Sequence, residues 1–321
     1  MKAYILRRLI QTIPSILTIL VITFFLIHTM SGDPISMIVG EGFETDPAFV
    51  ERMRERFGFD KPLHVQFILY MTNALQGNFG YSVFGPPVTQ LIMERLPATL
   101  LLTGSGLLFA LIAGIILGVL AASKPSSLRS GVISAISVGG YAIPVFWLAQ
   151  MMVILFALNL GWLPVSGMIT LREDYTGINH IIDVFKHLLL PSLALGIHQL
   201  ALISRLTRSS MLETLREDYI LTAKAKGLSS RKVVYWHALR NAVLPVVTVT
   251  GMQLGFLLAG AVLTETVFSW PGIGRLMYTS LLSRDYPVLM GIFIIISISV
   301  IIANLFTDLI YAYLDPRIQY E

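Results

Sequence analysis

The chain has 321 residues, of which 55% are hydrophobic and only 13% are charged, against about 25% charged residues in a typical soluble domain. Its mean hydropathy is +0.74, so too few charges remain to cover the water-facing surface of a soluble enzyme. The absence of Cys excludes a disulfide framework, thiolate metal sites and a Cys nucleophile. The formal net charge of +4 is too small to indicate nucleic-acid binding.

Six apolar runs come close to the length that a helix needs to cross a bilayer, which is about 20 residues. They are Leu9 to Met30, Thr99 to Ala122, Val132 to Leu160, His187 to Ile203, Ala242 to Val267 and Pro287 to Tyr313. The fourth run is the weakest, because it is short and contains Pro191, His198 and Gln199. Together the runs predict an all-α, polytopic membrane protein with six transmembrane helices.

The runs divide the chain into four regions. We expect residues 1–30 to be a cytoplasmic N-terminus and the first transmembrane helix, 31–98 an extracytoplasmic helical loop region, 99–313 a five-helix transmembrane core, and 314–321 a cytoplasmic tail. Leu63 to Leu75 has the pattern of a helix in the outer region. Lys and Arg accumulate in loops on the cytoplasmic side, and 8 of the 23 basic residues lie in the loop 204–241. We therefore expect that loop and both termini in the cytoplasm.

Small residues recur every four positions in two of the runs, which predicts grooves where another helix backbone can approach closely. These helix-packing positions are Gly106, Ala110, Gly114 and Gly118 in the second run, and Gly251 and Gly255 in the fifth. The sequence does not distinguish packing within the bundle from a translocation or subunit interface lined by the same faces. Prolines in the runs, Pro144 among them, favour helices that bend.

Ionisable side chains are scarce within the runs. Glu265 and Asp308 lie near run ends, where we expect capping or interfacial groups, and the sequence has no midspan carboxylate of the kind that ion-coupled carriers use. For His198, a hydrogen bond between packed helices is favoured, and contact with a substrate is the alternative. The pattern argues against a proton-coupled or ion-coupled carrier.

Motifs for catalysis are missing from the sequence. Gly80 to Gly85 has the glycine spacing of a phosphate loop, but Pro86 and Pro87 occupy the places of the required Lys and Ser/Thr. The six His are scattered, without the spacing of a metal site. We therefore predict no catalytic residue, no metal and no cofactor bound by this chain.

The loop 204–241 is the most informative segment. The three-and-four spacing of apolar residues predicts a helix from Leu212 to Lys226, which Gly227 would end. Ser229 or Ser230 can cap a second helix, from Arg231 to Arg240. That second helix would carry Val233, Trp236 and His237 on one side.

Two helices joined at a glycine would form a compact knob. Its crest, Ala223 and Ala225 beside Gly227, is small and apolar, and it would fit a groove on another protein. A basic amphipathic loop that lies on anionic lipid headgroups is the alternative.

The same segment resembles the coupling loop of ABC importer permeases, in the version found in the dipeptide, oligopeptide and nickel group. The motifs are Glu217-Asp-Tyr, Thr222-Ala-Lys-Ala-Lys-Gly-Leu228 and His237-Ala-Leu-Arg-Asn-Ala242, with Gly32-Asp-Pro34, Leu263-Thr-Glu-Thr-Val-Phe-Ser-Trp-Pro-Gly272 and Asp315-Pro-Arg317 elsewhere. The chain departs from the wider permease pattern at Leu221, Thr222, His237 and Arg240. Those departures match the peptide and nickel group.

The resemblance implies the first, B-type permease subunit of an importer with the type I permease fold. Such a chain would form half of a pore with a second homologous permease in a bacterial or archaeal cytoplasmic (inner) membrane. Two ATP-binding subunits would hold ATP and Mg, an extracytoplasmic solute-binding protein would deliver the substrate, and membrane lipid but no nucleic acid would be a partner.

Within that family, di- and oligopeptides are the favoured substrates. A nickel-chelate or oligosaccharide importer is the alternative, and a secondary carrier or channel is the rival from another class. The positions implied in ATPase coupling are Glu217, Asp218, Tyr219, Ala223, Ala225, Lys226, Gly227, His237 and Arg240. The sequence assigns no substrate-binding residue.

Overall fold

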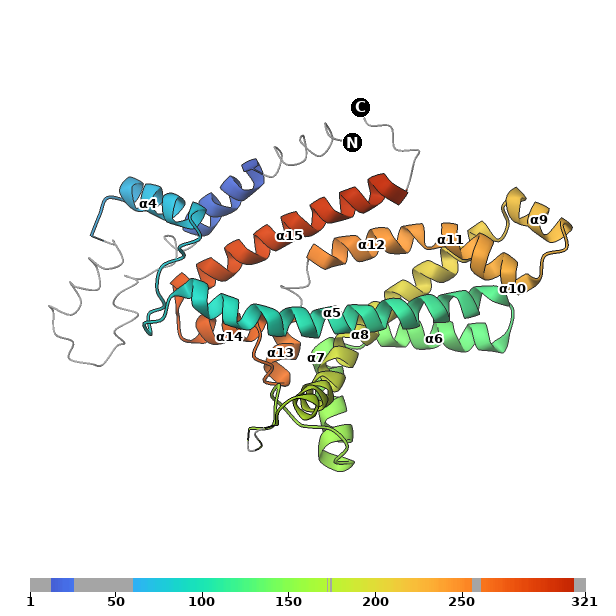
Figure 1. Cartoon of the computed structure of the whole chain (residues 1–321), viewed down its shortest axis with the longest axis horizontal. Coiled ribbons are helices and arrows are strands. Elements are labelled where there is room, and N and C mark those ends of the chain that lie inside the picture. Colours follow the sequence, from blue (N-terminus) through green and yellow to red (C-terminus); the bar gives the residue numbers. More distant parts are fainter. Residues whose placement is uncertain (1–12, 26–59, 172, 174, 256–260, 315–321) are drawn as a thin grey trace.

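The computed structural model describes residues 13–25, 60–171, 173, 175–255 and 261–314. This part of the chain is helical, and its β-type pairing is limited to an isolated antiparallel bridge between Tyr81 and Pro87. In Figure 1, α5 and α15 run lengthwise through an elongated molecule, with α9 and α10 at one end and α4 at the other.

The helices follow in chain order. They are Ile13–Phe25, α4 Leu63–Leu75, α5 Val88–Ser123, α6 Leu128–Ala142, α7 Val145–Met152, the π-helix η1 Val153–Asn159, α8 Ile178–Thr214, α9 Asp218–Ala225, α10 Ser230–Lys232, the π-helix η2 Val233–Ala238, α11 Leu239–Ala242, α12 Leu244–Gly255, α13 Val262–Val267, α14 Ile273–Leu282 and α15 Tyr286–Leu314. The helix predicted at Leu63 to Leu75 is confirmed as α4.

Among the described residues, three helices are long and apolar enough to cross a membrane: α5, α8 and the Tyr286–Leu305 part of α15. The weak fourth run lies within α8, which is 37 residues long and continues through Pro191. The first run is described only as Ile13–Phe25, and the fifth is divided between α12 and α13 around residues 256–260, which lie outside the description. The total of six spans therefore stays a prediction.

The third predicted span is not one continuous helix. α6 ends at Ala142, α7 begins at Val145, and the two halves are bent by 102°. Ile143 and Pro144 between them have ψ angles of 127° and 132°, as expected because proline disfavours helical geometry at the residue before it. The bend expected at Pro144 is confirmed.

The most extensive helix contact in the described part of the chain joins α5 to α8 along the predicted groove of small residues. A Cβ added to Gly106 would lie 3.1 Å from the carbonyl oxygen of Ser192, and one added to Gly114 would lie 2.8 Å from Cγ2 of Ile203. Gly118 faces Ser204 and Thr207 in the same way, and Ala110 is fully buried. The groove is confirmed, and its occupant is α8.

The second small-residue pattern is confirmed in part. Gly251 of α12 packs against the side chain of Thr307 in α15, where an added Cβ would overlap the threonine. Gly255 ends α12, and its surroundings lie outside the described residues, as does the side chain of Asp308 in α15.

In the N-terminal half of α5, the buried carboxylate of Glu265 connects α5, α13 and α14. Glu265 of α13 is 0% exposed, accepts a hydrogen bond from the Thr99 hydroxyl at 2.7 Å and accepts another from the backbone N–H of Arg275 at 2.9 Å. Arg275 is in the first turn of α14, so Glu265 caps that helix from outside. The capping role expected for Glu265 is confirmed.

The glycine contact between α5 and α8 predicts unequal effects of one substitution at two positions. Gly118→Ala should force α5 and α8 apart and lower the Tm of the purified chain by roughly 3–10 °C, because overpacking costs about 1–3 kcal/mol. Gly104→Ala is the matched control, since an added Cβ there meets nothing within 4 Å. Thermal unfolding followed by circular dichroism measures both Tm values. An equal decrease of the Tm in the two variants would contradict the close packing at Gly118.

Candidate functional site

Residues 215–242 fold as a knob at the end of α8. The helix predicted from Leu212 to Lys226 is wrong as a single element, because α8 continues to Thr214 and α9 begins only at Asp218. Between them, the N–H groups of Arg216 and Glu217 bond three residues back, to Glu213 and Thr214, which closes a turn. Glu217 then takes an extended backbone with ψ of 147° and starts α9 in a new direction.

Gly227 ends α9 as predicted. Its φ is +76°, in the left-handed region that favours glycine, and its N–H donates to the carbonyl of Lys224 at 2.9 Å. The chain then turns into α10, η2 and α11, as Figure 1 shows at the end of the molecule. Ser229 is the residue before α10, but its side chain accepts no capping hydrogen bond.

The knob is fastened to the spanning helices by a small apolar cluster. Ile220 and Ala223 of α9 pack with Val233, Ala238 and Ala242, and these residues meet Val119 and Ala122 of α5 and Met211 of α8. All are buried. The knob is therefore packed directly against the C-terminal ends of α5 and α8.

The predicted crest of two alanines is corrected by this cluster. Ala223 is only 6% exposed and points inward, whereas Ala225 is exposed. Positions two apart on an α-helix are about 200° apart around its axis, so they face opposite sides. Ala225 and Gly227 can meet a partner directly, and Ala223 can act only by supporting α9 from below.

The side predicted for the second helix is also wrong. Val233 is buried, but Trp236 is 72% exposed and His237 is half-buried. The reason is η2, where hydrogen bonds reach five residues instead of four; the buried positions Val233, Ala238 and Ala242 are accordingly five and four residues apart. A three-and-four pattern in the sequence could not show this change of register.

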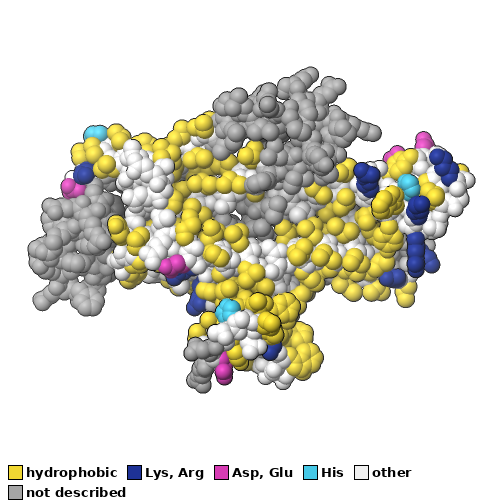
Figure 2. Space-filling view, in the orientation of Figure 1, with side chains coloured by type: hydrophobic (Ala, Val, Ile, Leu, Met, Phe, Trp, Pro, Cys, Tyr) yellow, Lys and Arg dark blue, Asp and Glu magenta, His cyan; other side chains and the backbone are white. Residues whose placement is uncertain are grey.

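The outer surface of the knob is charged and aromatic. Glu217, Asp218, Lys226 and Arg240 are exposed, and Figure 2 shows Lys and Arg gathered at this end of the molecule. Tyr219 is partly fixed, because the Asn241 side-chain amide donates to its hydroxyl at 2.7 Å. Of the predicted coupling positions, all except the buried Ala223 and the half-buried His237 are therefore exposed on one knob.

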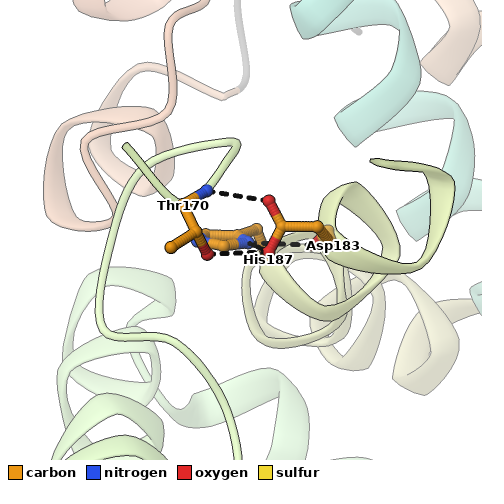
Figure 3. Close-up of polar contacts among 3 residues, drawn as sticks. All are labelled: Thr170, Asp183 and His187. Carbon is orange, nitrogen blue, oxygen red and sulfur yellow. Dashed lines mark hydrogen bonds and ion pairs between the residues drawn. The ribbon is translucent and has the colours of Figure 1, made fainter. Parts of the chain in front are cut away.

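A second polar site lies at the opposite end of α8, and the sequence reasoning missed it. Thr170 donates from its backbone N–H and its hydroxyl to the two carboxylate oxygens of Asp183, both at 2.8 Å, as Figure 3 shows. His187 approaches the same carboxylate at 3.5 Å and the Asp183 carbonyl at 2.9 Å. The i, i+4 spacing of Asp183 and His187 was the available signal.

Thr170, Asp183 and His187 form a latch that holds the loop before α8 against the helix. An open cavity lies beside this latch. The cavity has a volume of about 460 Å³. It is lined by polar and aromatic side chains that include Trp162, Tyr175, Asn179 and Lys186. Within the described part of the chain, His, Asp and Glu side chains form no group of three or more that could hold a metal ion.

Sequence comparison finds a family match along nearly the whole chain. The pattern of the family described as "Binding-protein-dependent transport system inner membrane component" matches residues 114–320, and its N-terminal counterpart matches residues 1–103.

Curated relatives align from end to end. The chain is 43% identical over 336 residues to a di/tripeptide transport system permease protein of Pseudomonas aeruginosa, with 100% of both chains covered. It is 39% identical over 322 residues to an oligopeptide transport system permease protein of Bacillus subtilis, and 40% identical over 339 residues to a dipeptide transport system permease protein of Escherichia coli, again with full coverage of both chains.

Structural comparison supports the fold. An inward-facing structure of the MetNI methionine ABC transporter superposes with a TM-score of 0.56 at 18% sequence identity, covering 70% of this chain and 97% of that one. The shared architecture is that of a type I permease, which confirms the predicted fold class.

The structure of the knob predicts different outcomes for the same substitution at Ala223 and at Ala225. Ala223→Leu should overfill the cluster beneath α9 and destabilise the chain by about 1–3 kcal/mol, whereas Ala225→Leu should leave the Tm unchanged because the side chain would extend into solvent. Thermal melts of the two purified variants measure the difference. A larger loss for Ala225→Leu would show that α9 faces the other way.

Proposed function

Because the chain belongs to the family of binding-protein-dependent inner-membrane transport components, we propose that it is a permease subunit of an ATP-driven importer for di- and oligopeptides. The observation that carries the substrate class is full-length identity of about 40% to three permeases named for peptide transport. A nickel-chelate or oligosaccharide cargo is the alternative, since the same scaffold can serve a different binding protein.

The knob supplies the surface on which an ATP-binding subunit would dock. Ala225 and Gly227 are small and exposed between charged neighbours, so a groove on the partner can approach the α9 backbone closely. Glu217 and Arg240 would add charged contacts at the edge, and Trp236 offers a large exposed aromatic of the kind that dominates binding surfaces. ATP and Mg would be bound by two such partner subunits, and this chain would carry no catalysis.

The fastening of the knob gives this docking a mechanical consequence. The cluster connects α9 directly to α5 and α8, and those two helices are in contact along their glycine groove. A close-packed interior transmits displacement instead of absorbing it. Movement of the ATPase subunits would therefore tilt the α5–α8 pair as a unit.

The other half of the pore would come from a second homologous permease. Large apolar side chains on α6 and α7, including Ile136, Val138 and Phe146, are exposed in the single chain, and they provide surface for a partner subunit or for lipid. An extracytoplasmic binding protein would deliver substrate at the opposite end, beside the latch of Thr170 and Asp183.

The described carboxylates favour this assignment over an ion-coupled carrier. Glu265 is already committed to the Thr99 hydroxyl and the α14 backbone, and Asp285 accepts from Ser82. Carboxylates that relay protons or bind ions need free oxygen atoms facing a pathway.

The proposal predicts ATP-dependent peptide uptake that depends on Gly227. In proteoliposomes with the co-expressed partner subunits and binding protein, a labelled dipeptide should accumulate, while a nickel chelate and an oligosaccharide should not. Gly227→Val should lower uptake and binding-protein-stimulated ATP hydrolysis by about tenfold, because a β-branched residue resists positive φ by roughly 1–2 kcal/mol and would redirect the chain after α9.

Gly77→Val is the matched control for backbone strain. Gly77 follows α4, has φ of +74° and, like Gly227, has no atom within 4 Å of an added Cβ. The variant Gly77→Val should leave co-purification of the ATP-binding subunits at the wild-type level, whereas Gly227→Val should reduce this co-purification. Equal losses in both variants would reject a docking role for Gly227, and uptake of the chelate or the oligosaccharide alone would reject the peptide assignment.

The proposed orientation, with the knob in the cytoplasm, predicts one-sided labelling of introduced thiols. The chain contains no Cys, so single substitutions report without background. A membrane-impermeant maleimide should label Leu171→Cys in spheroplasts with a sealed cytoplasmic membrane, since Leu171 is highly exposed at the latch end. Lys226→Cys should react only after the inner membrane is permeabilised, and the reverse pattern would overturn the orientation.

A further inference from the structure

A basic pocket lies between α6 and α8 close to the knob. Its volume is about 210 Å³. Arg205 and Arg208 of α8 form one wall, and Tyr141, Ser134 and Ser137 of α6 form the other. The sequence placed both arginines in a loop, but α8 carries them as part of a helix that is long enough to span the membrane.

The two arginines lack anionic partners in the described part of the chain. Arg208 Nε is buried with no hydrogen-bond partner. The Arg205 guanidinium lies 5.6 Å from the centre of the Tyr141 ring. The residues that line the pocket include no carboxylate. A cation at this position in a spanning helix is costly unless an anion or water satisfies it.

The ring of Tyr141 is held in place from α8. Its centroid lies 4.7 Å from that of His198, with the rings inclined by 25°. Among the described residues, His198 therefore packs against α6 by stacking instead of by the expected hydrogen bond. Ser137 and Ser204 approach each other at 3.3 Å across the same helix pair. The pocket is therefore built by α6–α8 packing and is not a chance gap between mobile side chains.

The position and the lining match an amphipathic ligand. Arg205 and Arg208 lie within three turns of the knob end of α8, where the lipid headgroups would be. Ile133, Val138 and Ala201 add apolar lining beside Ser204, and Val132 and Ile136 on α6 expose further apolar surface. Basic pockets between helices on the cytoplasmic side are typical sites for anionic lipid headgroups.

We propose that the α6–α8 pocket binds the headgroup phosphate of an anionic phospholipid from the leaflet on the knob side. The two guanidinium groups would hold the phosphate oxygens, the serine hydroxyls would donate to them, and the acyl chains would lie along α6. A lipid bound here would fasten α6 to α8 beside the knob. The inference rests on the orientation given under the proposed function.

The test measures lipid binding to the purified full-length chain with its co-purifying subunits. Native mass spectrometry would count lipids retained during titration with phosphatidylglycerol or with zwitterionic phosphatidylethanolamine. Each basic side chain near an anionic lipid surface strengthens binding about fivefold. The double variant Arg205→Gln, Arg208→Gln should therefore weaken the tightest phosphatidylglycerol site about 25-fold and leave phosphatidylethanolamine retention unchanged.

Two further variants separate charge from folding and from general surface attraction. Arg205→Lys with Arg208→Lys keeps both charges and should retain most of the binding. Arg216→Gln with Lys232→Gln removes two exposed cations from the knob and should leave the site intact. The proposal would be overturned if the double variant Arg205→Gln, Arg208→Gln kept its affinity for phosphatidylglycerol. An equal loss of affinity in the double variant Arg216→Gln, Lys232→Gln would overturn it as well.

A substrate carboxylate is the competing occupant, and it gives a different result. If the pocket served the peptide, the Gln pair at positions 205 and 208 would keep its phosphatidylglycerol affinity and would lose uptake of a free-acid dipeptide relative to its C-terminal amide. That outcome would overturn lipid binding while leaving the peptide importer in place. Because lipid retention is read by mass, it can be measured whether or not the complex transports peptides.

Discussion

The close contact between α5 and α8 is the constraint on which the other features depend. In a bilayer, lipid is as apolar as a leucine side chain, so helix association relies on close packing instead of the hydrophobic effect. Gly106, Gly114 and Gly118 allow the α8 backbone to come within van der Waals distance of α5 over three turns. The same two helices then support the knob at one end and the Thr99–Glu265 cap at the other.

Buried carboxylates serve as fasteners at the end away from the knob. Asp183 holds the loop before α8, Glu265 joins α13 and α14 to α5, and Asp285 accepts from Ser82 at 2.5 Å, which ties the segment before α5 to the start of α15. Each accepts hydrogen bonds from groups distant in sequence, and these offset the cost of removing charge from water. The described part of the chain thus uses its few buried charges to set the positions of connecting segments.

The sequence predicted features that depend on local chemistry. Four-residue spacing of small residues identified the α5 groove, the apolar pattern identified α4, and Gly227 adopts the positive φ that ends α9. It did not predict features set by several segments together. The turn at Glu217 and the π-helical register of η2 decide which of Ala223, Ala225 and Trp236 are exposed. Latch residues Thr170 and Asp183 are joined only when the loop folds back on α8.

The burial of Ala223 decides how force would pass between the knob and the helices that it packs against. An exposed crest containing both alanines would leave α9 attached only through its ends. With Ala223 buried, α9 has one face for the partner and the other in the cluster with Val119 and Met211. Displacing such a helix by more than a fraction of an ångström requires its neighbours to move with it. The stiff route therefore runs from α9 through the cluster to the α5–α8 pair, and it extends to α7, because Ala149 and Met152 of α7 pack with Leu190 and Ala194 of α8.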